Sequence, residues 1–231
     1  MLITEMILIS LSPINTSEFI YTFLRGSWGS KHQHVAAYLL EDLRLLNKIR
    51  IKNVSFLRKE LNISGRIQIL DRSPTGIPIL DDLMVKLSKH RKSLYRWIRF
   101  LGKERYNILG KEKYNIQTRI LDQMVEDGLI KQIYGRYKIL NLDKRNEIRK
   151  IVRNCLLSKK IPNQYMRSLI ALCHVIKKWY INKNFIENKE FNRYWFKELK
   201  SWSKSIAKEN TIAYWLSYGY RSRKNHIPYF P

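Results

Sequence analysis

Apolar residues recur at helical spacing along much of this chain, and this periodicity constrains its fold more than any other feature. Within residues 35–46, apolar side chains stand at positions 35, 36, 39, 40, 43 and 46, which predicts an α-helix with one face on a core. Further helices are predicted over residues 80–87, 93–101, 114–127, 144–157 and 164–180. The last of these is apolar on nearly all sides, so we expect it to be central. Glycine and proline are scarce, at nine and six residues, so we expect a mainly α-helical fold.

Short segments that alternate apolar and polar residues predict β-hairpins between these helices. Residues 48–54 and 66–70 form one such pair. Residues 129–134 and 136–142 flank Gly135 and form a second.

Turn residues mark the helix boundaries. Asn47 is a plausible stop for the first helix, and Gly128 suits a left-handed cap after residues 114–127. Residues 73–78 contain two prolines and a glycine and predict a rigid turn. Asp81 and Asp82 follow it in the expected first turn of a helix, where the helix dipole favours carboxylates.

No repeat, linker or low-complexity tract interrupts the sequence, so we expect a single domain over residues 1–231. Residues 1–24 make a poorly defined start, in which residues 2–11 fit either a strand or a short buried helix and residues 18–24 a short helix. Residues 25–30 are expected to form a loop, and residues 186–231 a basic, aromatic and helical C-terminal part.

Cysteine content and hydropathy bear on the compartment. Cys155 and Cys173 are the two cysteines, too few for a disulfide framework or a metal-binding quartet. The longest apolar stretch, near the N-terminus, is too short to span a bilayer. We therefore expect a cytoplasmic protein.

The charge of the chain points to an anionic partner. Its 44 Lys and Arg against 19 Asp and Glu give a formal net charge of +25, whereas solubility needs a magnitude of roughly 2–8. Residues 86–113 alone hold ten basic and two acidic residues. Nucleic acid and anionic lipid are the two partner classes large enough to match this excess.

Catalytic patterns are weak. Asp81 and Asp82 point about 100° apart on a helix, and helix N-terminal charge explains them better than paired catalysis. His32 and His34 lack further ligands nearby and suit a surface or capping role, while His174 lies in an apolar run typical of a core. We expect no enzyme activity, no metal and no cofactor.

Basic and aromatic residues occur together in two places. Lys92, Arg96 and Arg99 are spaced four and three apart and predict a cationic stripe beside an apolar one; the alternative is an ordinary solvated helix face. Trp28, between Ser27 and Gly29 in the expected loop, is either packed in the core or offered to a partner such as the lipid–water boundary.

A rival interpretation is a winged-helix nucleic-acid-binding protein, because residues 119–142 run helix, glycine, strand, glycine, strand. The outer face of that helix argues against it, since two acids dilute its basic and amide groups. That face comprises Gln117, Arg119, Asp122, Gln123 and Glu126.

The order of these segments resembles the Golgi phosphoprotein 3 family, including its prokaryotic relatives. Three stretches carry the resemblance: residues 36–51 with Asp42 seven before the strand, residues 73–98 from the Pro-Thr-Gly turn to Trp97-Ile98, and residues 119–142. A weaker similarity lies at residues 167–174. Together they cover roughly residues 2–185.

The resemblance implies a monomeric helical domain that binds membranes peripherally, with phosphatidylinositol 4-phosphate as lipid and glycosyltransferase tails as protein clients. It also implies a Golgi location if the organism is eukaryotic. The family's lipid pocket uses a loop tryptophan, which corresponds to Trp28, and three arginines. Those three positions are Ala36, Tyr114 and Gln117 in this chain, and Lys31 and Arg119 lie nearby in sequence.

Two groups of residues are therefore predicted to meet the membrane. The headgroup-binding residues are Trp28, Lys31, Tyr114, Gln117 and Arg119. The membrane-surface residues are Lys92, Arg96, Arg99, Arg136 and Lys138, the last two from the hairpin that the resemblance places against the bilayer. The alternative for this hairpin is ordinary protein surface.

Overall fold

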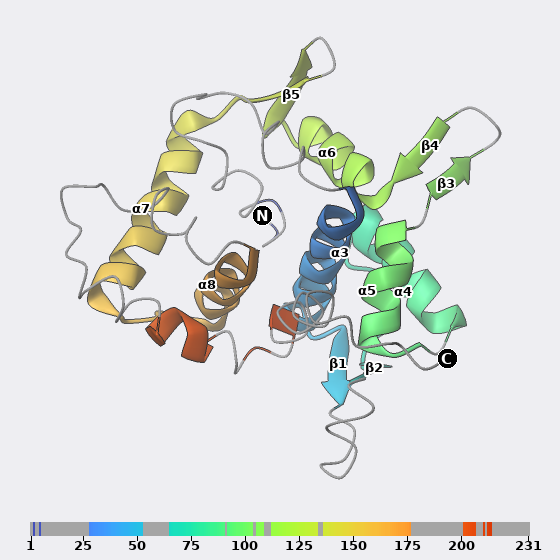
Figure 1. The fold of residues 1–231 in the computed structure, drawn as a ribbon. Helices are drawn as coiled ribbons and strands as arrows, with labels where there is room; N and C mark the ends of the chain where they lie inside the picture. The colour runs from blue at the N-terminus through green and yellow to red at the C-terminus, as the bar shows by residue number, and fades with distance from the viewer. Residues whose placement is uncertain are drawn as a thin grey trace. The chain divides into compact units, whose positions relative to one another are not determined.

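The computed structural model describes residues 2, 5, 28–52, 65–90, 92–103, 105–108, 112–133, 136–176, 201–206, 210 and 212–213 (Figure 1). It divides into two compact units, Met1–Asn146 and Glu147–Pro231. The fold is mainly helical, as predicted, and the strands in the described part form three short antiparallel pairs. The prediction of one domain over the whole chain stays a prediction.

Helix α3 (Trp28–Leu45) is the central helix of the first unit. Its predicted apolar stripe is buried from Val35 to Leu43, but Leu46, the last predicted member, lies beyond the helix and is exposed. Asn47 ends it in the left-handed conformation with φ 56°, so the Lys48 N–H reaches the Leu43 carbonyl oxygen at 2.9 Å and the Asn47 N–H reaches Arg44 at 3.1 Å. These two bonds satisfy carbonyls that the helix end leaves without partners.

The expected loop over residues 25–30 is wrong in its second half, because Trp28, Gly29 and Ser30 already belong to α3. The loop prediction relied on the low helix propensity of glycine and serine. In a first turn the backbone N–H groups have no intrahelical partner in any case, so these residues are tolerated there.

Strand β1 (Ile49–Lys52) follows α3 and pairs with β2 (Arg66–Ile69), as predicted. The buried Lys48 joins the end of α3 to the next turn: its Nζ lies 2.6 Å from Asp71 Oδ2 and 2.6 Å from Ser73 Oγ. Hydrogen bonds from the Lys48 ammonium and from Ser73 hold the pKa of Asp71 well below its ordinary value.

Helix α4 (Pro78–Lys89) begins after this turn, with Pro78 in its first turn. Asp81 Oδ1 accepts the Thr75 N–H at 2.6 Å and the Thr75 hydroxyl at 2.7 Å. Burial would raise the pKa of Asp81, but the hydrogen bonds from Thr75 and Gly76 and the charge of Lys48 outweigh burial and lower it. The predicted rigid turn is thus held to the first turn of α4 by the hydrogen bonds from Thr75 to Asp81.

Helix α5 (Leu94–Lys103) packs extensively on α3. Gly102 makes this approach possible, because a Cβ there would stand 2.6 Å from Gln33 Cγ and 2.8 Å from the Gln33 backbone nitrogen. Trp97 is buried beside it, with its ring edge-on to Phe100 at 5.7 Å between centroids. A residue without a side chain therefore sets the spacing of the two helices.

Strand β3 (Arg105–Ile108) pairs with β4 (Glu112–Asn115), and α6 (Ile116–Glu126) follows at once. The helix predicted from residue 114 is wrong at its start, since Tyr114 lies in β4, opposite Tyr106. Tyrosines and isoleucine favour strands over this segment, and the helical stripe begins only at Ile116.

The predicted stripe of α6 is buried at Ile116, Ile120, Leu121 and Met124, but Val125 is exposed. Gly128 caps the helix with φ 68°, as predicted, and β5 (Ile130–Ile133) then pairs with β6 (Arg136–Ile139).

Helix α7 (Leu142–Ser158) enters the second unit, where α8 (Gln164–Ile176) follows it. Both helices bury apolar residues, among them Val152, Leu156, Leu169 and Leu172. Cys155 is buried as well. Asn210 Nδ2 donates to Ser168 Oγ at 3.3 Å, and residues 201–206 are helical.

Several sequence predictions lie outside the described residues. They concern most of residues 1–24, residues 177–180 of the last predicted helix, most of residues 186–231, and the side chains of Cys173 and His174. In the part that is described, no helix has the length and apolar character needed to cross a bilayer.

Candidate anion-binding surfaces

The β1–β2 pair has one cationic face. Directly opposite residues of an antiparallel pair share a face, and successive residues alternate between faces. The register sets Lys52 opposite Arg66 and Arg50 opposite Gln68, and all four residues are exposed. The other face carries Ile49, Ile51, Ile67 and Ile69, which are buried or half-buried. We call Arg50, Lys52 and Arg66 the β1–β2 basic face.

The chain does not neutralise this face within its described part, where no carboxylate lies at ion-pair distance from Arg50, Lys52 or Arg66. Like charges placed directly opposite each other across a strand pair are destabilising. The pairing of Lys52 with Arg66 therefore leaves positive potential directed at the solvent.

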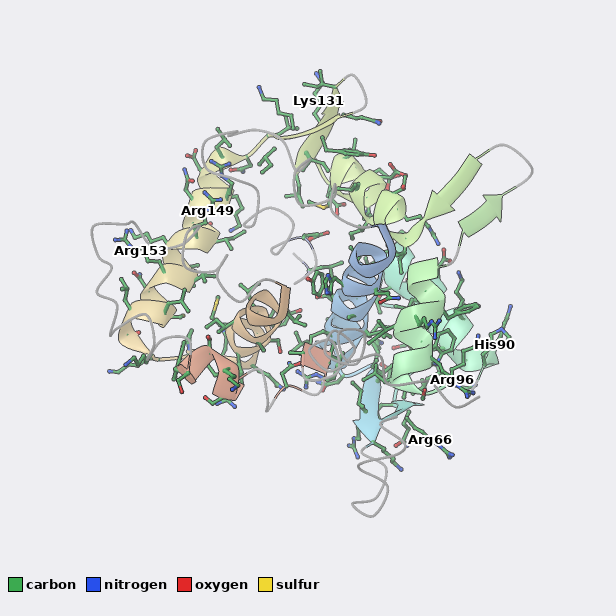
Figure 2. All side chains as sticks on the ribbon, viewed as in Figure 1. Arg66, His90, Arg96, Lys131, Arg149 and Arg153 are labelled. Carbon is green, nitrogen blue, oxygen red and sulfur yellow. The ribbon has the colours of Figure 1, made fainter. Side chains whose placement is uncertain are left out.

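The start of α5 extends this surface. The Gly65 carbonyl accepts the Leu94 N–H at 2.7 Å, and Arg66 forms an antiparallel bridge with Ser93. Ser93 Oγ in turn accepts the Arg96 N–H at 3.3 Å, and the first turn of α5 contains no acid. Figure 2 shows Arg66 and Arg96 toward the same end of the first unit.

The predicted cationic stripe of Lys92, Arg96 and Arg99 is broken at its first member. Arg96 and Arg99 are exposed on α5, but Lys92 precedes the helix and its Nζ lies 3.5 Å from the Phe100 ring centroid and 5.0 Å from that of Trp97. An ammonium over aromatic faces gains about 0.5–1 kcal/mol at an exposed site. Lys92 is thus held against two rings and does not continue the stripe.

The β5–β6 pair also places two cations directly opposite each other, although Lys138 is half-buried. Lys131 stands directly opposite Lys138, and the register position of Arg136, opposite Ile133, is on the same face. The side chain of Arg136 is not among those described. Lys131 is exposed and points away from the unit in Figure 2. We call Lys131, Arg136 and Lys138 the β5–β6 basic face.

The structure brings together the elements that carry the predicted headgroup-binding residues. Trp28 and Lys31 are in the first turn of α3, Tyr114 is in β4, and Gln117 is in the first turn of α6. Helix α6 contacts both α3 and β4. The first turn of α3 is at the end of that helix nearest to α6 (Figure 1). The side chains of these four residues are outside the described part.

Two further positions were considered for the headgroup, Ala36 and Arg119, and neither offers a free cation to a phosphate. Ala36 is fully buried in α3 and offers no contact to a phosphate. Arg119 forms an ion pair through Nη2 with Asp82 Oδ2, so its guanidinium ties α6 to α4.

The residues weighed for catalysis are separated by their contacts. Asp81 accepts hydrogen bonds from Thr75, whereas Asp82 pairs with Arg119. The surface or capping role predicted for the His32–His34 segment is wrong for His34, which is buried and stacks on Tyr38 with 6.3 Å between ring centroids. His34 is drawn inward because it lies on the helix face that packs into the core.

Sequence reasoning missed Arg50, Lys52, Arg66 and Lys131 as surface residues. The signal was present in the alternation of isoleucine with polar residues at 49–52 and 66–69. That alternation indicated strands, but only the register shows which charges face each other.

A family model described as Golgi phosphoprotein 3 (GPP34) matches residues 29–217. A comparison with curated proteins gave no match.

Proposed function

The chain belongs to the Golgi phosphoprotein 3 family, and on that premise we propose that it is a peripheral membrane protein that binds anionic phospholipid through its basic surfaces. Membership is consistent with non-enzymatic adaptor work at the Golgi. In this role the protein would hold clients such as glycosyltransferase tails at a membrane.

One observation carries the lipid-binding proposal. Two hairpins of the first unit each place two cations directly opposite each other, Lys52 with Arg66 and Lys131 with Lys138. Like charges directly opposite each other lower stability, and no described carboxylate lies at ion-pair distance from Lys52 or Arg66. An anionic bilayer compensates, because each Lys or Arg near its surface gains about 1 kcal/mol.

Nucleic acid fits these surfaces less well. A winged-helix reader would present α6 to the bases, yet Arg119 on α6 pairs with Asp82 and Gln123 Nε2 donates to Asp127 Oδ1 at 3.1 Å. Both side chains are engaged within the protein. Asp122, Glu126 and Asp127 add negative charge at this helix, which would oppose phosphate backbones.

Headgroup selection is proposed to be weak. The positions of the family's three arginines are Ala36, Tyr114 and Gln117, and Arg119 is paired with Asp82. A phosphomonoester that lacks guanidinium partners loses charge-assisted bonds of about 1.5–3 kcal/mol each. We therefore expect attachment by diffuse charge, with Trp28 and Lys31 as local contacts and phosphatidylinositol 4-phosphate bound little better than other anionic lipids.

Cosedimentation with vesicles tests the proposal. The protein should bind vesicles that contain phosphatidylserine or phosphatidylinositol 4-phosphate, with similar affinity, and binding should weaken as salt rises. Trp28→Ala should reduce binding, whereas Trp202→Ala in the second unit should not. Equally low binding to anionic and neutral vesicles at low salt would overturn the proposal. So would duplex DNA that displaces the protein from vesicles when DNA and lipid are present at the same phosphate concentration.

A further inference from the structure

We propose that the β1–β2 basic face is a second membrane-docking surface, separate from the β5–β6 basic face, so that one molecule can bridge two anionic bilayers. The inference rests on the proposed function, since it assumes that anionic lipid is the partner. None of the residues predicted to meet the membrane belongs to the β1–β2 basic face, although one of them, Arg96, adjoins it.

The two faces lie toward opposite ends of the first unit. Strand β1 leaves the C-terminal end of α3 directly, and β5 packs on α6, which contacts α3. Figure 1 shows β1 and β2 at one end of α3, and α6 with β5 at the other. Helix α3 has 18 residues and thus a length of about 27 Å.

This separation exceeds the reach of surface electrostatics. The Debye length is about 8 Å at physiological ionic strength, so a bilayer docked at the β5–β6 end attracts the β1–β2 basic face only weakly. The β1–β2 basic face then remains available to a second anionic surface.

The chemistry of the β1–β2 basic face fits a headgroup layer. Its outward positions are Arg50, Lys52, Arg66 and the amide of Gln68, while the isoleucines take the inward positions. No aromatic residue stands among these outward positions, so stacking on nucleic-acid bases is not offered there. Adsorption to phosphates without insertion is the interaction that this face can make.

The hairpin is also held firmly enough to present its charges. The Gly65 carbonyl binds the Leu94 N–H, the Lys48 carbonyl binds the Leu70 N–H at 2.8 Å, and the Lys48 side chain is fixed by Asp71. These contacts join β1 and β2 to α3, α5 and the turn before α4. Docking therefore requires no ordering of these strands.

The test compares vesicle binding with vesicle clustering for vesicles of phosphatidylcholine and phosphatidylserine. Wild type should bind in cosedimentation and cluster the vesicles in light scattering. The triple variant Arg50→Glu, Lys52→Glu, Arg66→Glu should retain binding within about twofold, through the other face, but lose clustering. The variant Lys131→Glu, Arg136→Glu, Lys138→Glu should behave in the same way, and the combination should lose binding as well.

A matched control separates position from total charge. Lys150→Glu, Lys160→Glu and Lys204→Glu make the same charge change at exposed residues of the second unit and should leave clustering intact. Unfolding midpoints and solution mass of each variant, measured in parallel, identify variants that misfold or change oligomeric state.

Several outcomes would overturn the inference. The inference fails if the β1–β2 variant clusters vesicles as well as wild type, or if it loses binding in proportion to clustering. It also fails if the control variant loses clustering to the same extent, or if wild type forms a dimer that the β1–β2 variant no longer forms. If wild type binds without clustering, the inference fails and the proposed function stands. If wild type does not bind anionic vesicles, the proposed function itself fails.

Discussion

Lys52 lies directly opposite Arg66 across the β1–β2 pair, both are exposed, and no described carboxylate stands between them. Cross-strand pairs contribute roughly 0.2–1 kcal/mol, and like charges make that contribution unfavourable. This pair therefore weakens the hairpin while it adds to the surface potential, so stability and anion binding should change in opposite directions on substitution.

Lys52→Glu should raise the free energy of unfolding by about 0.2–1 kcal/mol, because a like-charge pair becomes an opposite-charge pair. It should also weaken the clustering of anionic vesicles. Urea denaturation and light scattering measure the two effects. Arg50→Glu is the control: Gln68 is opposite, so its stability gain should be smaller. A loss of stability in Lys52→Glu would contradict the cross-strand argument.

Gly102→Ala should destabilise the protein by about 1–3 kcal/mol, because the new Cβ would meet Gln33 in the adjacent helix. Helix propensity alone predicts the opposite sign, a gain of about 1 kcal/mol. Denaturant titration decides between them. Adding Gln33→Ala should rescue the variant only in part, since the Gln33 backbone nitrogen remains 2.8 Å from the Cβ position.

Arg119 and Asp82 should be coupled in a double-mutant cycle. Arg119→Gln, Asp82→Asn and the double variant should give a coupling free energy of about 0.2–1 kcal/mol, as expected for an exposed ion pair. Their unfolding free energies in urea provide the cycle, and the coupling should shrink at high salt. Strict additivity would show that the ion pair does not tie α6 to α4 in solution.

Acid should weaken the protein partly through Asp71. Its pKa in the folded state lies below the unfolded value of about 3.9, so Asp71 adds stability above that pH, and the stability is lost as pH falls further. The free energy of unfolding, measured in urea at about pH 5 and pH 3, should decrease less between these two pH values for Lys48→Met than for wild type. Lys89→Met, an exposed lysine, is the control and should retain the wild-type decrease.

The helices were predictable because their buried residues follow the helical period. The stripe from Val35 to Leu43 is buried in α3, although its last predicted member, Leu46, is exposed. Asn47 and Gly128 end their helices as predicted, and both have a left-handed backbone. The other errors lie at helix starts. Trp28 and Tyr114 were misplaced because a helix's first turn obeys different rules from its interior, and because a short strand can run straight into a helix.

The candidate surfaces were predictable only in part. Local spacing identified Arg96, Arg99 and Lys138 as basic positions, and the structure supplies their neighbours. Local spacing could not identify the ion pair between Asp82 and Arg119, which are 37 residues apart, or the placement of Lys92 against Phe100. Both depend on how helices pack, which sequence periodicity does not determine.

The alternation in β1 and β2 has an evolutionary consequence. The same eight residues specify the isoleucine face and the basic face, and they do so only through their parity along each strand. An insertion or deletion of one residue within either strand would turn its cations inward and its isoleucines outward. During divergence, this hairpin should therefore tolerate many changes of residue identity but very few changes of strand length.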